Sequence, residues 1–463
     1  MGFQDLQPEL LYQICEYFCQ HCTETYSIAP EHENWQAHAH NIIRRRALLD
    51  LSLVCRSWSP VAQNVLHHHF GFYETACDCQ VQFCRTISQR PELGNQLKVA
   101  RLHHEKAFLY PANGGSWIAR ALDKYPNFLA YKMNASDMNV SDWQVYIAPL
   151  ILLQAPNLEH AVVHGTLDWM LFNTFNKPAV IQANALPRNL RMLSLGNEGQ
   201  VIHGDGLRPV DLSETGMGGL FPALNNLEVL TVSNPDSFSI YAELSLQGLR
   251  ILRLANICIT KEQLQILVDI PTCLEEFAFH DMGDASFTAD GAVTSGEVFE
   301  VLASKKDTLK RVVVKMDSGQ QTHTSSKQLV NLEKLRVNWR AFCDVFGLAF
   351  HQQHLDDQAF INAFPSSLHT LRLEASTESI YRIRKAVIAY INSTYRKSRE
   401  EQKLREVIIH YKDLQSLVPP MDGINSTEEM MAFNERLIRG RCPEWFENGN
   451  LIITKKPILW YSI

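Results

Sequence analysis

The chain has no apolar run that approaches the roughly 18 residues of a membrane-spanning helix. It also has no excess of positive charge, because 43 Lys and Arg residues stand against 50 Asp and Glu residues, for a formal net charge of −7. A nucleic-acid-binding surface is normally basic, so we expect a protein that binds neither nucleic acid nor a membrane. The first residues carry Asp5 and Glu9 in place of a basic segment. We therefore expect no secretory signal and an intracellular location, cytoplasmic or nuclear.

Catalytic sequence motifs are missing as well. The sequence has no G-x-S-x-G nucleophile elbow, no H-E-x-x-H motif, no G-x-x-x-x-G-K-[ST] phosphate loop and no protein-kinase motif set. Its 11 cysteines are an odd number scattered along the chain, and they do not form a compact disulfide framework. We therefore expect a reduced, non-catalytic protein that needs no cofactor and acts by binding other proteins.

Two short apolar patterns with helical spacing lie near the start of the chain. Pro8 suits the first turn of a helix, where a missing N–H costs nothing. Apolar residues follow it at helical spacing: Leu10, Leu11, Ile14, Tyr17 and Phe18. In the second pattern four residues recur at intervals of three and four, which places them on one face of a helix: Leu48, Leu51, Cys55 and Trp58. A generic pair of buried helices would show the same periodicity.

The order of the residues is more specific than their periodicity. The first pattern reads Leu6-Gln7-Pro8-Glu9-Leu10-Leu11-x-x-Ile14, and the second ends Val54-Cys55-Arg56-x-Trp58. Together they resemble the two halves of the F-box, the helical module that docks substrate receptors on a Skp-type adaptor of cullin-RING ubiquitin ligases. The family opens Leu-Pro-x-Glu-Leu-Leu-x-x-Ile, so the proline of this chain falls one place late and Gln7 holds its usual position.

The resemblance implies a three-helix module in residues 1–70 and a set of residues that bind the adaptor. Some of them must instead hold the three helices together, and Trp58 is expected to do both. The implied adaptor-binding residues are Leu6, Pro8, Leu10, Leu11, Ile14, Leu48, Leu51, Val54, Cys55 and Trp58.

A polar insert of about 25 residues, at about 20–46, separates the two halves. It opens Cys19-Gln20-His21-Cys22 and continues with His32, His38 and His40, and two thiolates with two imidazoles would complete a tetrahedral zinc site. However, nine residues separate Cys22 from His32 where a zinc finger has about twelve. Cys15 and Cys19 also fall on the apolar side of a helix, where free cysteine is often a small hydrophobic residue. The sequence therefore favours no metal, and the run His67-His68-His69 is expected to be surface, with at most one of the three packed.

The rest of the chain repeats one short pattern, apolar-x-x-apolar-x-apolar, which predicts a strand with an apolar anchor just upstream. We count eleven such cells, spaced by 22 to 37 residues. They lie at 97–102, 128–133, 158–163, 190–195, 227–232, 249–254, 274–279, 309–314, 332–337, 368–373 and 404–409.

Helical patterns lie between the cells, for example after Thr260, at 295–303 and at 376–391. Strand and helix alternating at this period resemble leucine-rich repeats, whose strands stack into one curved parallel sheet. A doubly wound α/β domain is the alternative, but its strands would be apolar on both faces. We therefore predict an α/β chain in four parts: the F-box at 1–70, a helical linker at 71–96, an irregular leucine-rich-repeat-like solenoid at 97–415 and a C-terminal cap at 416–463. Segments 196–219 and 281–295 are expected to be loops.

A basic residue stands between the last two apolar positions of five cells: Arg101, Lys132, Arg253, Arg336 and Arg372. These side chains are expected to point out from the open face of the sheet. They are either solubilising surface or a ridge that binds an acidic or phosphorylated protein substrate, because guanidinium groups grip phosphate in pairs of hydrogen bonds. The combined layout resembles the F-box families of filamentous fungi. It implies a substrate receptor of an SCF-type ubiquitin ligase, and the alternative is a repeat scaffold that works outside ubiquitination.

Overall fold

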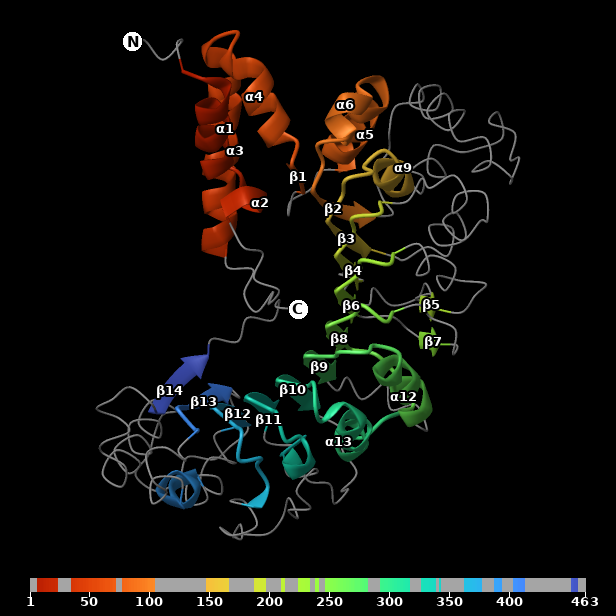
Figure 1. The fold of residues 1–463 in the computed structure, drawn as a ribbon, viewed down its shortest axis with the longest axis vertical. Helices are drawn as coiled ribbons and strands as arrows, with labels where there is room; N and C mark the ends of the chain where they lie inside the picture. The colour runs from red at the N-terminus through yellow and green to blue at the C-terminus, as the bar shows by residue number, and fades with distance from the viewer. Residues whose placement is uncertain are drawn as a thin grey trace, which may run out of the picture. The chain divides into compact units, whose positions relative to one another are not determined.

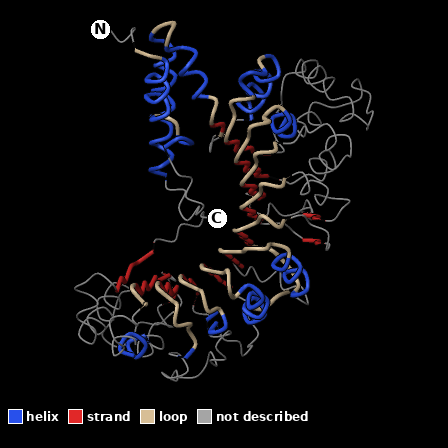
Figure 2. Tube along the Cα trace, viewed as in Figure 1, coloured by secondary structure: helices blue, strands red, loops and turns tan. Residues whose placement is uncertain are grey.

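In the computed structural model the chain forms two compact units, Met1–Leu249 with Ser462–Ile463 and Arg250–Tyr461, which are described separately. Figures 1 and 2 show the helices and strands of the chain. The described residues are 6–23, 35–71, 77–104, 147–165, 187–196, 210–212, 224–233, 238–240, 246–281, 292–316, 326–338, 341–342, 362–376, 387–393, 403–412 and 451–456. Within these ranges no helix is both long enough and apolar enough to cross a membrane.

The first unit opens with four helices: α1 (Pro8–Tyr17), α2 (Gln20–Thr23), α3 (Trp35–Val54) and α4 (Trp58–Leu66). Helix α4 packs against both α1 and α3, so the three longer helices form one module (Figure 1). Its apolar core is formed by Leu11, Cys15, Cys19, Leu48, Trp58, Ala62 and Val65.

Two expectations for this module were wrong in detail. The stretch 48–58 is not one helix, because α3 ends at Val54 and α4 begins at Trp58. Pro60 gives the physical reason, since proline has no N–H to donate to the carbonyl of Arg56 and so belongs in the first turn of a new helix. In addition, α3 begins at Trp35, so the second part of the expected insert is helix that continues into the apolar pattern.

A parallel run of strands follows α4 directly, in the order β1 (His69–Phe70), β2 (Val99–His104), β3 (His160–Gly165), β4 (Met192–Gly196) and β6 (Val229–Ser233). The sheet therefore starts inside the predicted F-box range, at His69. Helices α5 (Cys77–Gln89) and α6 (Pro91–Gly94) occupy the stretch where a helical linker is expected, and α5 and α9 (Ile147–Leu153) pack on β2.

The predicted cell at 128–133 lies outside the described residues. Strands β2 and β3 pair directly, from Val99 with His160 to His104 with Gly165, which leaves no place for a strand between them. One of the expected loops also contains a strand, because β5 (Val210–Leu212) pairs with β7 (Phe238–Ile240) in a small parallel sheet.

The second unit continues the same construction in seven neighbouring parallel strands. They are β8 (Ile251–Ala255), β9 (Glu276–Asp281), β10 (Arg311–Met316), β11 (Lys334–Asn338), β12 (Thr370–Ser376), β13 (Glu406–Lys412) and β14 (Leu451–Lys456). Strand β14 pairs with β13, so the expected C-terminal cap adds a strand to the sheet. Two expected helices are present as α12 (Lys261–Asp269) and α13 (Ser295–Leu302), followed by the short 3₁₀ turns η5 (Ala303–Lys305) and η6 (Ser326–Gln328). Residues 387–393 of a third expected helix are also helical.

The two faces of this sheet differ, as expected for a repeat sheet. One register row is apolar throughout, and each member is at most 1% exposed: Leu252, Phe277, Val312, Leu335, Leu371 and Val407. The neighbouring row, on the other face, is mixed. It contains Arg253, Arg336 and Arg372 together with three buried apolar residues, Ala278, Val313 and Ile408, so this face is less open than expected. Ten of the eleven predicted cells contain a described strand, so the prediction of an α/β chain built on a parallel sheet is confirmed.

Residues of alternating charge stand immediately before the strands and help to fix their register. In the first unit these are Lys98, Glu159, Arg191 and Glu228. The backbone N–H of Glu159 donates to the carbonyl of Lys98, that of Arg191 to Glu159 and that of Glu228 to Arg191, each at 2.8 Å. Lys98 Nζ donates to Glu159 at 2.8 Å, and Arg191 makes two hydrogen bonds of 3.0 Å to Glu228. Opposite charges placed directly across neighbouring strands are stabilising.

The second unit has the same arrangement, in which Glu275 lies between Arg250 at 2.8 Å and Lys310 at 3.5 Å. Burial alone would raise the pKa of Glu275, but the hydrogen bond from Arg250 and the two positive charges outweigh it and lower that pKa. In both units these charged pairs lie just before the strands, so they align each strand with its neighbour in a single register.

Candidate functional site

The residues implied to bind an adaptor fall into three groups by exposure. Leu11, Leu48 and Trp58 belong to the core of the helical module, at 2–3% exposed. Leu6, Ile14, Leu51 and Cys55 are partly buried against that core. The exposed members are Pro8, Leu10 and Val54. Trp58 is therefore a core residue, which corrects the expectation that it serves the core and the adaptor face together.

Helix α3 also carries exposed apolar side chains that the resemblance did not name. Ile42, Leu49 and Leu53 are 51%, 45% and 82% exposed. Their spacings of seven and four residues place them in one stripe along the helix. We call Leu10, Ile42, Leu49, Leu53 and Val54 the exposed apolar surface of the module. The stripe on α3 is its continuous part, and contiguous exposed apolar residues are a feature of protein interaction sites. The i, i+7, i+11 spacing was readable in the sequence, but the assumption of an insert up to residue 46 hid it.

The arginines expected on the open sheet face are more enclosed than a binding ridge requires. Arg253 is 8% exposed and donates to Glu276 at 2.8 and 3.1 Å. Arg336 is 7% exposed and forms an ion pair with Glu374, which Lys315 also contacts at 2.8 Å. These cations therefore have protein carboxylates as partners, so a role in holding neighbouring strands together accounts for them.

The other basic residues of this set add little to a ridge. Arg101 and Arg372 are partly buried, and Lys132 lies outside the described residues.

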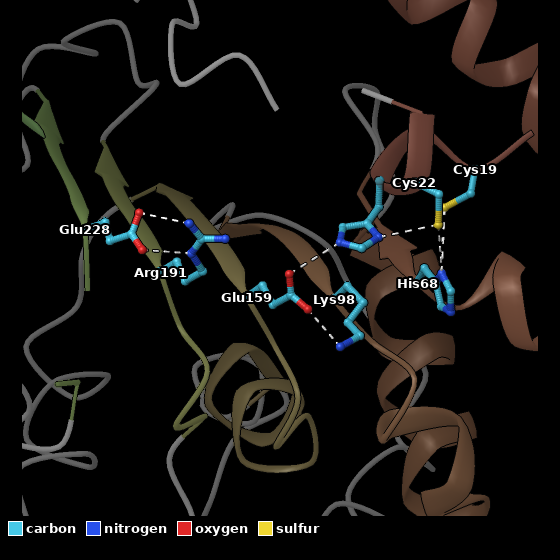
Figure 3. A network of polar contacts seen from close by, with 8 residues as sticks. Cys19, Cys22, His68, Lys98, Glu159, Arg191 and Glu228 are labelled. Atoms are coloured by element: carbon cyan, nitrogen blue, oxygen red, sulfur yellow. Dashed lines mark hydrogen bonds and ion pairs between the residues drawn. The ribbon is translucent and has the colours of Figure 1, made fainter. Parts of the chain in front are cut away.

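A group of thiol and imidazole side chains lies where the helical module meets the sheet of the first unit. Cys19 follows α1, His21 and Cys22 lie on α2, and His68 lies between α4 and β1 (Figure 3). Their ligand atoms all lie within 4.8 Å of one another. Nδ1 of His68 lies 3.5 Å from Sγ of Cys22 and 3.9 Å from Sγ of Cys19, and Nδ1 of His21 lies 3.7 Å from Sγ of Cys22.

Charged residues before the strands orient this cluster. Nε2 of His21 lies 3.5 Å from a carboxylate oxygen of Glu159, and Lys98 holds the other oxygen at 2.8 Å (Figure 3). The imidazole of His21 therefore has its two nitrogens between a thiol and a fixed carboxylate. This places the Cys19–His21–Cys22–His68 cluster at the edge of the sheet, next to the point where β3 begins.

The pKa values of the two thiols of the cluster are shifted in opposite directions. A hydrogen bond from the Cys22 thiol lowers the pKa of Cys19 far below its ordinary value, against the effect of burial, and hydrogen bonds from His21 and His68 add to this. The same hydrogen bond and burial raise the pKa of Cys22. Bonding to Cys19 also raises the pKa of His21, although burial acts to lower it.

The structure changes the reading of several histidines. His68 is 8% exposed, which fits the expectation that one residue of 67–69 is packed, whereas His67 and His69 are partly buried and not fully on the surface. Side chains of His32, His38 and His40, which the sequence offered as candidate metal ligands beside the cysteines, lie outside the described residues. Cys22 and His68 are 46 positions apart in the sequence, which explains why spacing could not reveal their contact. The chain matches no protein-family model, and no curated protein matches its sequence.

Proposed function

We propose that this chain is the substrate receptor of an SCF-type cullin-RING ubiquitin ligase. In this role it is a non-catalytic subunit that binds a Skp-type adaptor through residues 6–66 and a protein substrate through the repeat sheet. The observation that carries the proposal is that a three-helix module with an F-box-like sequence exposes apolar side chains that its own core does not need. Leu53 and Val54, beside the Val-Cys-Arg-x-Trp motif, are 82% and 61% exposed.

The energetics of that surface support a binding role. Each exposed Leu or Val gains roughly 1.5–3 kcal/mol when it is fully buried. A few such side chains on one helix supply much of the free energy of a micromolar complex, which is about 8 kcal/mol. Leu11, Leu48 and Trp58 are in the core and keep α1, α3 and α4 in place for this contact.

The experiment is a titration of the full chain with a purified Skp-type adaptor. Leu53→Glu and Val54→Glu place a charge on exposed positions without disturbing the core, and the dissociation constant should rise at least about tenfold, since each change removes about 1.5 kcal/mol or more of apolar burial. Val330→Glu is the matched control, because Val330 is 52% exposed and lies in the second unit. Wild-type chain that does not bind the adaptor would leave the repeat scaffold outside ubiquitination as the better account.

A further inference from the structure

We propose that Cys19, His21, Cys22 and His68 bind one zinc ion in a tetrahedral site that ties the helical module to the sheet of the first unit. Neither the F-box resemblance nor the proposed receptor role requires this site. It rests on the mutual distances of the four ligand atoms, on the carboxylate behind His21, and on the position of the cluster between two elements that are distant in sequence.

The distances match those of a tetrahedral site. With Zn–S of about 2.3 Å and Zn–N of about 2.0–2.1 Å, the ligand atoms of a tetrahedron lie roughly 3.3–3.8 Å apart. Three of the six distances between ligand atoms, the sulfur–nitrogen distances of 3.5, 3.7 and 3.9 Å, fall in or next to this range. All six lie within 4.8 Å, so the ligands need to draw together by about 1 Å at most to hold the ion. Two sulfurs and two imidazole nitrogens are the usual donor set of structural zinc, and soft thiolates select zinc over magnesium or calcium.

The surroundings of His21 follow the pattern of a metal-binding histidine. Such histidines nearly always donate their second N–H to a carboxylate or a carbonyl, which fixes the ring and strengthens the ligand. Here Glu159 lies 3.5 Å from Nε2, while Nδ1 faces Cys22. Lys98 holds the carboxylate in place at 2.8 Å. A thiol that merely fills space in a core has no need of this arrangement.

Burial and access are also consistent with a structural metal site. Cys19 and His68 are 2% and 8% exposed, whereas Cys22 is exposed, so an ion can reach the cluster from solvent. On binding, any proton still held by the two sulfurs passes to solvent or buffer, and both sulfurs ligate as thiolates. The bound ion would join α2 to the residue that precedes β1, and so stabilise the module against the sheet.

The first test measures metal in the full chain, purified with a reductant and without chelator. The expected result is one zinc per chain by elemental mass spectrometry, and Co²⁺ added to the metal-free chain should give the absorption bands of tetrahedral thiolate-bound cobalt. Wild-type chain with neither zinc nor these bands would overturn the proposal and leave a thiol–imidazole hydrogen-bonded network. Loss of two hydrogens from the peptide that contains Cys19 and Cys22, with no metal bound, would instead show a disulfide between them, which also overturns it.

Variants then locate the ion. Cys22→Ser and His68→Asn should abolish stoichiometric zinc, while Cys273→Ser, at an exposed cysteine in the second unit, should retain it. Glu159→Gln keeps all four ligands and should weaken zinc binding about 10- to 100-fold in a chelator competition. Because Cys22 is exposed, its serine variant can be checked for intact fold by circular dichroism. Zinc that persists in both ligand variants would place the ion elsewhere and refute the assignment.

Discussion

Replacing Trp58 by alanine tests how the helical module is held together. The indole is 3% exposed and lies in the core with Leu11 and Leu48. Truncating a buried tryptophan costs about 3–5 kcal/mol. At about 0.05–0.15 kcal/mol per residue, a module of this length has a total stability of roughly 3–9 kcal/mol. The substitution therefore removes at least about a third of that stability, and the population of the open module should rise at least about 100-fold.

Hydrogen exchange measured by mass spectrometry resolves this effect, because the two units need not unfold together. Amides of α1 and α4 should exchange at least about 100-fold faster in Trp58→Ala, as expected for a loss of about 3 kcal/mol. Strands β9–β13 should exchange as in the wild type. Leu53→Ala is the control, because an exposed truncation costs within about 0.5 kcal/mol. Unchanged protection of α1 and α4 in Trp58→Ala would refute the assignment of Trp58 to the core.

This outcome decides how a binding experiment is interpreted. If Trp58→Ala loses the adaptor because the module opens, the loss says nothing about a direct contact of Trp58 with the adaptor. Exposed positions such as Leu53 and Val54 are the informative ones.

Three further predictions concern the second unit. Glu374→Gln leaves the buried Arg336 and its neighbour Lys315 without their shared carboxylate. Hydrogen exchange of the amides of β11 and β12 should therefore become faster by the equivalent of about 3–5 kcal/mol. A smaller effect than that of Arg336→Met would contradict this reasoning. Thr260→Ala removes one half of the capping box of α12 and should cost about 1 kcal/mol, seen as faster exchange in α12 alone. The pKa of Glu275 is lowered in the folded chain, so the stabilisation that Glu275 gives is present above its ordinary pKa of 4.5 and is lost as the pH falls below that value. In Glu275→Gln the free energy of unfolding should therefore depend less on pH in the acid range. An unchanged pH profile would count against this prediction.

The sheet could be predicted from the sequence because its signal is local. In Leu249-x-x-Leu252-x-Leu254, for example, the three apolar anchors of the cell are each at most 1% exposed, and Leu252 shares its register row with the apolar residues of the neighbouring strands. Capped helices such as α12 are also encoded locally, by Thr260 and Gln263. Strand β1 was missed because two residues, His69 and Phe70, carry no periodicity.

The features that the sequence did not reveal depend on contacts between distant residues. Arg336 meets Glu374 from a neighbouring strand 38 residues away, so its enclosure is invisible in its own cell. Cys22 meets His68 across 46 residues because α1, α3 and α4 fold back on one another. The division of the F-box-like residues into core and surface likewise depends on helix packing, which buries Leu48 and leaves Leu49 exposed.

The proposed function is tested most directly by affinity capture of the full chain from cells with quantitative mass spectrometry of what it brings down. A substrate receptor should capture a Skp-type adaptor together with its cullin, Leu53→Glu should lose both, and Val330→Glu should retain both. A chain that captures neither adaptor nor cullin, or captures them equally in all three forms, would contradict the proposal.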